Sequence, residues 1–121
     1  MRILIVEDNP DVGVTLRMVL QALGHEIRHV HDGETALDVV ASFNPQAIVL
    51  DLGLPGMTGH EVASLTRKTC GEDLLIVALT GWGREADRER SRQAGIDHHL
   101  VKPLNLEVLK EVLKTHPAYC H

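Results

Sequence analysis

Short apolar runs alternate with longer, more polar segments along the whole chain, and this alternation predicts the order of its secondary structure. Uninterrupted apolar runs lie at 3–6, 47–50 and 74–79. Strands that are apolar on both faces are typical of the interior of a parallel sheet that helices cover on both sides. The more polar segment at 26–30 predicts a strand at the edge of the sheet. We expect β-strands at about 2–6, 26–30, 46–51, 74–79 and 97–101.

The segments between these strands have the spacing and the boundary residues of helices. After the first strand, Asn9 is a good N-cap, Pro10 suits the first helical turn, and Gly24 suits the position after the helix. The apolar residues of this helix recur at helical spacing and predict one buried face: Val12, Leu16, Val19, Leu20 and Leu23. We expect helices at about 10–23, 33–42, 58–69, 84–93 and 106–115, the last capped by Asn105.

A strand followed by a helix, five times over, predicts an α/β fold: (βα)5, with a doubly wound parallel sheet between two layers of helices (α/β/α). The crossover connections are expected to be right-handed. No repeat, low-complexity tract or change in composition divides the chain. We therefore expect a single domain over 1–121, with its core at about 2–115.

Composition and charge narrow the possible functions. The net charge of −5 with neutral histidines disfavours direct nucleic-acid binding, because phosphates would be repelled. No apolar stretch approaches the ~20 residues that a membrane-spanning helix needs, and the N-terminus lacks the pattern of a signal peptide. Cys70 and Cys120 are far apart in the sequence and fit free thiols in a reducing compartment. We expect a cytoplasmic protein that binds neither nucleic acid nor a membrane.

Polar side chains follow the predicted central strands at the point where each strand ends. Asp51 ends the apolar run of the third strand, and Glu7 and Asp8 follow the run of the first. Thr80 follows the fourth strand and Lys102 the fifth. Ligands of open parallel sheets bind at the carboxyl ends of the strands, so these side chains predict a shared site.

The types of these side chains indicate the chemistry of the site. If the first and third strands are neighbours, Asp8 and Asp51 lie ~5 Å apart, where two carboxylates repel by several kcal/mol at an effective dielectric of ~20. Such a site takes up a proton or binds a cation, and hard oxygen ligands suit Mg²⁺ best. An aspartate can attack phosphorus and form an acyl phosphate, while Lys102 and Thr80 can contact phosphoryl oxygens. The residues alone thus predict a Mg²⁺-dependent phosphoacceptor aspartate.

In this order and context, Glu7-Asp8, Asp51, Thr80 and Lys102-Pro103 resemble the response-regulator receiver (CheY-like) domain of two-component signalling. The resemblance extends from about residue 2 to 115 and implies the flavodoxin-like strand order 2-1-3-4-5. It implies that a histidine kinase or histidine phosphotransferase donates a phosphoryl group, and that the domain switches conformation towards a target or an output domain. Beyond accepting and losing this group, such a domain is not an enzyme.

Carried over to this chain, the resemblance makes Asp51 the phosphorylation site. It gives Mg²⁺ four protein ligands, which are the side chains of Glu7, Asp8 and Asp51 and the backbone carbonyl of Gly53. It also assigns Thr80 and Lys102 to the phosphoryl group. Finally, it makes the bond from Lys102 to Pro103 cis, which would aim Lys102 into the site.

The chain departs from the common receiver pattern three residues before the lysine. Receivers often carry an aromatic residue there that turns inward with the threonine, whereas this chain has His99, which we expect to act as the switch residue and to titrate near neutral pH. The segment 95–103 is similar to receivers attached to hybrid sensor histidine kinases. Gly53 and Trp82 occupy positions that tune dephosphorylation in receivers, and we expect them to favour a longer-lived phosphoryl group.

Two other classes of protein remain possible on the sequence, and the first is an α/β enzyme that is either phosphatase-like or flavodoxin-like. A phosphatase-like enzyme would usually have a second Asp two residues after the nucleophile, where this chain has Gly53. A flavodoxin-like protein would bind phosphate after the first strand, where Glu7 and Asp8 would repel it. An interaction module of receiver fold that is never phosphorylated is the other alternative, and failure to bind Mg²⁺ would favour it.

Overall fold

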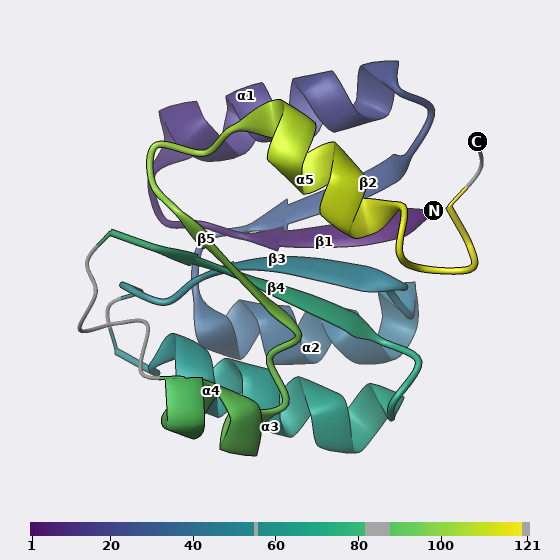
Figure 1. The fold of residues 1–121 in the computed structure, drawn as a ribbon. Coiled ribbons are helices and arrows are strands. Elements are labelled where there is room, and N and C mark those ends of the chain that lie inside the picture. The colour runs from purple at the N-terminus through teal and green to yellow at the C-terminus, as the bar shows by residue number, and fades with distance from the viewer. Residues whose placement is uncertain (55, 82–87, 120–121) are drawn as a thin grey trace.

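The fold is a parallel sheet between two layers of helices (Figure 1). A computed structural model describes residues 1–54, 56–81 and 88–119. All strand pairs are parallel, and the order β2-β1-β3-β4-β5 confirms the prediction, with the polar strand at an edge. The strands are β1 (Arg2–Val6), β2 (Glu26–Val30), β3 (Ala47–Asp51), β4 (Leu75–Thr80) and β5 (His98–Val101).

Helices α1 and α5 cover one face of the sheet, and α2, α3 and α4 cover the other (Figure 1). Leu16, Leu20, Leu109 and Leu113 pack on the first face. Ala36, Val40, Val62 and Ala63 pack on the second. The helices are α1 (Pro10–Ala22), α2 (Gly33–Phe43), α3 (Gly59–Cys70), α4 (Arg88–Ala94) and α5 (Leu106–Leu113). None of the helices in the described ranges is long and apolar enough to cross a bilayer.

Two details of the helices differ from the prediction. Helix α5 ends at Leu113 rather than near 115, because the amides of Thr115 and His116 bond three residues back and tighten the last turn. Val12 in α1 and Leu23 directly after it are 39% and 44% exposed, because the buried face of α1 is centred on Gly13, Leu16 and Leu20. The predicted N-caps Asn9 and Asn105 are confirmed, since each side chain accepts two backbone N–H groups.

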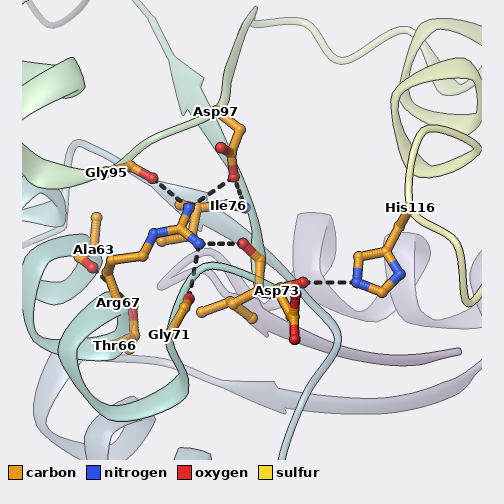
Figure 2. Close-up of polar contacts among 10 residues, drawn as sticks. Ala63, Thr66, Arg67, Gly71, Asp73, Ile76, Gly95, Asp97 and His116 are labelled. Atoms are coloured by element: carbon orange, nitrogen blue, oxygen red, sulfur yellow. Dashed lines mark hydrogen bonds and ion pairs between the residues drawn. The ribbon is translucent and has the colours of Figure 1, made fainter.

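One arginine connects the loops at the end of the sheet opposite to the carboxyl ends of the strands. Arg67, in the last turn of α3, donates from Nη1 to the carbonyls of Gly71 and Leu74 (Figure 2). Its Nη2 donates to Gly95 and lies 2.8 Å from Oδ2 of Asp97. The same Asp97 oxygen accepts from the amide of Ile76 at 2.8 Å. This arginine therefore fixes the starts of β4 and β5, the strands that carry Thr80 and Lys102 at their other ends.

Replacing Arg67 with methionine is expected to lower the free energy of unfolding by about 2–3 kcal/mol, because hydrogen bonds from a charged donor to partly buried carbonyls are lost. Urea unfolding followed by circular dichroism measures the change. Arg92→Met is the matched control, because its ion pair with Glu89 is exposed on both sides and should contribute below about 1 kcal/mol. Equal effects of the two substitutions would contradict the importance of the Arg67 contacts.

Candidate functional site

A cavity of about 480 Å³ lies at the end of the sheet where the strands terminate, between the carboxyl ends of β1, β3, β4 and β5. It lies beside β1, where the order of the strands reverses, which is the expected place for a ligand in an open parallel sheet. The lining residues are Glu7, Asp8, Asn9, Val12, Asp51, Gly53, Gly81 and Lys102.

Three carboxylates meet in this cavity. β1 and β3 are direct neighbours, with Val6 opposite Leu50, so Glu7, which follows β1, lies beside Asp51, the last residue of β3. One oxygen from each of Glu7, Asp8 and Asp51 lies within 4.8 Å of the others. The side chains of Glu7 and Asp51 are buried, and Asp8 is exposed. The predicted convergence of acidic residues is therefore present, with its two inner members largely removed from water.

Loop amides hold the two buried carboxylates in place. Asp51 Oδ1 accepts a 2.8 Å hydrogen bond from the amide of Gly53, and Glu7 Oε1 accepts one of 3.2 Å from Asn9. The loop after β3 also packs closely against the start of α3. A Cβ added at Gly59 would lie only 2.7 Å from the Cα of Leu52. A glycine at the start of α3 thus permits the close approach that keeps this loop next to the cavity.

Lys102 places its ammonium between the buried carboxylates. Its Nζ lies 3.0 Å from Asp51 Oδ2 and 3.9 Å from Glu7 Oε2. Partial burial disfavours the charged amine, but the hydrogen bond to Asp51 and the charges of Asp51, Glu7 and Asp8 outweigh it and raise the pKa of Lys102. The ammonium therefore stays protonated and offsets part of the negative charge.

The Oε2 atom of Glu7 lies 3.9 Å from the Lys102 ammonium, too far for a hydrogen bond. Burial raises the pKa of its carboxyl, and the charge of Asp51 raises it further, against weaker opposing effects of the Asn9 amide and Lys102. Its Oε2 is buried and has no hydrogen-bond partner among the described residues. Within the described part of the chain, one ammonium beside three carboxylates leaves the cluster net negative, so the donor set fits a hard cation that takes oxygen ligands. Mg²⁺ would be held by Glu7, Asp8 and Asp51, and Gly53 lines the same cavity.

The raised pKa of Glu7 predicts a pH-dependent stability when no metal is present. A carboxyl that binds its proton more tightly when folded contributes stability below its unfolded pKa of about 4.5. This contribution is lost as the pH rises through the raised folded pKa. Wild type should therefore lose stability relative to Glu7→Gln over that range, as measured by urea unfolding in EDTA at a series of pH values. A stability difference that is independent of pH would contradict the burial of a charged Glu7.

The predicted switch residues lie outside the cavity lining. Thr80 is fully buried, and its Oγ1 has no hydrogen-bond partner within the described ranges. His99 is half-buried, with Nε2 2.6 Å from Oγ of Ser91 in α4. The peptide bond from Lys102 to Pro103 is cis, as predicted. Trp82 lies outside the described residues.

Two further residues lie near His99, and no sequence pattern had indicated either of them. Ser91 is 1% exposed, and its Oγ also lies 3.1 Å from Nε2 of His60, a buried residue of α3. The hydroxyl therefore bridges two imidazoles and connects α3, α4 and β5. A serine within the polar α4 segment and a histidine within α3 carry no spacing that would have indicated this contact.

The response regulator receiver domain family matches residues 3–114 of this chain. The response regulator MprA of Mycobacterium avium (strain 104) is 42% identical over 109 residues, which are 90% of this chain and 47% of MprA. The chain thus spans about half the length of the curated relatives it matches.

Two solved structures similar to this chain contain magnesium. The response regulator TrrA of Thermotoga maritima, in complex with Mg²⁺-BeF, is 36% identical with a TM-score of 0.84, over 94% of this chain and 96% of that one. The receiver domain of the sensor histidine kinase PA1611 of Pseudomonas aeruginosa, with magnesium in its active-site cleft, is 32% identical with a TM-score of 0.83, over 94% of each chain. By fold, site and sequence, the chain belongs to the response regulator receiver domain family.

Proposed function

We propose that Asp51 accepts a phosphoryl group from a phosphohistidine of a partner protein, and that this transfer requires Mg²⁺ at the acidic cluster. The observation that carries the proposal is the meeting of Glu7, Asp8 and Asp51 around one cavity with the Lys102 ammonium 3.0 Å from Asp51. Mg²⁺ in related structures supports the same assignment.

The residues of the cavity have separable roles in this reaction. A carboxylate oxygen of Asp51 attacks phosphorus, and the bond from phosphorus to the donor imidazole breaks with its electron pair on nitrogen. The Gly53 amide orients the Asp51 carboxylate, because it donates a hydrogen bond to Oδ1. Mg²⁺ bound by Glu7, Asp8, Asp51 and the Gly53 carbonyl would neutralise charge on the phosphoryl oxygens. Lys102 would move from Asp51 to these oxygens.

We propose that the phosphorylated state is read through Thr80 and the contacts of His99. A buried hydroxyl without a hydrogen-bond partner in the described residues is costly, and a phosphoryl oxygen on Asp51 would offer it an acceptor. Thr80 precedes Gly81, which lines the cavity, so a small movement would reach it. His99 on β5 contacts Ser91 on α4, so movement of β5 would be passed to α4. The populations of two conformations of the surface formed by α4, β5 and α5 would then shift.

The partners follow from this chemistry. A histidine kinase or a histidine phosphotransferase would supply the phosphoryl group, and a target or an output domain would bind the changed surface. The domain would catalyse only its own phosphorylation and dephosphorylation. A cytoplasmic location fits such partners.

The proposed function is tested with acetyl phosphate as a small donor, by intact-mass spectrometry of the protein with Mg²⁺ and with EDTA. We expect one added phosphoryl group with Mg²⁺ and none with EDTA. A folded protein that takes up no phosphoryl group under either condition would indicate an interaction module of receiver fold instead.

A further inference from the structure

We propose that His29 is a positioning residue for the metal-binding carboxylates, acting through the backbone of Glu7. The proposal rests on the proposed function of the acidic cluster, since it assigns a role toward Mg²⁺ to a residue outside the cavity lining. His29 lies on the edge strand β2, on the far side of β1 from Asp51.

The contact that carries the proposal joins the His29 ring to the main chain. Nε2 of His29 lies 3.0 Å from the carbonyl oxygen of Glu7. A carbonyl oxygen only accepts, so Nε2 must carry the proton and donate it. The amide of Glu7 is bonded in turn to the carbonyl of Val30 at 3.1 Å. β2 therefore holds Glu7 on both sides, by its backbone at the amide and by a side chain at the carbonyl.

The position of Glu7 in the chain makes this contact relevant to the site. β1 ends at Val6, and the carbonyl of Glu7 belongs to the peptide group that leads into Asp8. The orientation of this peptide group sets the direction in which the exposed Asp8 side chain leaves the backbone. Removing the imidazole donor would free the peptide to rotate and would disturb two carboxylates at once. Partners that orient metal ligands affect metal affinity although they do not touch the metal.

Helix α1 has a glycine where the imidazole needs space. A Cβ added at Gly13 would lie 2.0 Å from Cε1, 2.1 Å from Nε2 and 2.8 Å from Nδ1 of His29. The three nearest atoms thus all belong to one ring, and any side chain at position 13 would displace it. A glycine in the middle of a helix costs about 0.5–1 kcal/mol relative to alanine. The helix thus carries a destabilising residue at a place where the ring lies against it.

Two substitutions at His29 distinguish the effect of its hydrogen bond to Glu7 from the effect of the shape of its ring. His29→Phe keeps a ring but removes the donor, and it is expected to weaken Mg²⁺ binding about tenfold. His29→Gln keeps a donor at the position of Nε2 and is expected to bind Mg²⁺ within about threefold of wild type, a rescue that ring shape alone would not give. His31→Phe is the control, because His31 is exposed and contacts the His29 ring without bonding to Glu7. Isothermal titration with Mg²⁺ measures all four proteins.

Gly13→Ala provides an independent route to the same state, with His29 still present. In the wild-type background it should displace the ring, weaken Mg²⁺ binding about as much as His29→Phe, and lower stability. In a His29→Ala background the added methyl group meets none of the three ring atoms, so Gly13→Ala should leave Mg²⁺ affinity unchanged and no longer destabilise.

The outcomes are distinct. Weaker Mg²⁺ binding by His29→Phe and by Gly13→Ala, with His29→Gln and His31→Phe close to wild type, would support the positioning role. Equal Mg²⁺ affinity of wild type, His29→Phe and Gly13→Ala would overturn it and leave the proposed function intact. A wild-type protein that binds no Mg²⁺ would overturn the proposed function and, with it, the role of His29.

Discussion

The Asp51→Asn variant is expected to take up no phosphoryl group from acetyl phosphate with Mg²⁺, under conditions in which wild type becomes phosphorylated. An amide oxygen is a poor nucleophile towards phosphorus, and the substitution also removes the negative charge of one of the three carboxylates that fit the metal. The substitution is nearly isosteric at a buried position, so the protein should remain folded. Intact-mass spectrometry measures the loss, which is expected to be complete.

Asp38→Asn is the matched control for this experiment, because Asp38 is an exposed aspartate of α2, remote from the cavity lining. It should be phosphorylated as wild type is. A phosphoryl group that persists in Asp51→Asn would show that another residue accepts it, and would contradict the assignment of Asp51.

The Lys102→Met variant is expected to bind Mg²⁺ more tightly and yet to accept phosphoryl groups more slowly. Removing an ammonium that lies 3.0 Å from Asp51 also removes its repulsion of a divalent cation, which we expect to raise Mg²⁺ affinity about tenfold. Among the described residues that line the cavity, Lys102 is the only lysine or arginine. Its loss should slow phosphoryl acceptance on the order of a hundredfold, the usual effect of deleting one electrostatic contact to a transition state.

A higher Mg²⁺ affinity together with slower phosphorylation distinguishes this role from a general loss of structure, because an unfolded site would lose both Mg²⁺ binding and phosphorylation. Titration calorimetry gives the affinity, and the time course of the phosphorylated mass gives the rate. Lys114→Met is the control, since Lys114 follows α5 and pairs with Glu111 at 3.2 Å, away from the cavity. Weaker Mg²⁺ binding in Lys102→Met would contradict the electrostatic role.

The sequence predicted the sheet and the convergence of the site because both follow from local patterns. Apolar runs identified the central strands β1, β3 and β4, and a parallel sheet brings the carboxyl ends of its strands to the same end of the sheet. The acidic residues, Thr80 and Lys102 could therefore be assigned to one region before any contact was known. The residue types alone predicted a Mg²⁺-dependent phosphoacceptor aspartate, whereas the strand order, the Gly53 carbonyl as a ligand and the cis bond before Pro103 came from the family resemblance.

The contacts that hold the site could not be predicted in the same way. They join residues on different helices and strands whose types are ordinary where they occur: His29 with the Glu7 carbonyl, Ser91 with two histidines, and Arg67 with Asp97. The exposure of Val12 and Leu23 was also missed. Helical spacing predicts which face of a helix is apolar, but it does not predict how many residues of that face are covered by the sheet. Packing between elements decides these points, and no local pattern records it.

The most direct test of the central claim is to locate the phosphoryl group chemically. After phosphorylation with acetyl phosphate and Mg²⁺, borohydride reduces an aspartyl phosphate to homoserine, and peptide sequencing by mass spectrometry then identifies the modified position. We predict homoserine at position 51 alone, and none when Mg²⁺ is replaced by EDTA. Modification at another carboxylate, phosphate retained on a histidine, or labelling that is independent of Mg²⁺ would contradict a Mg²⁺-dependent acyl phosphate at Asp51.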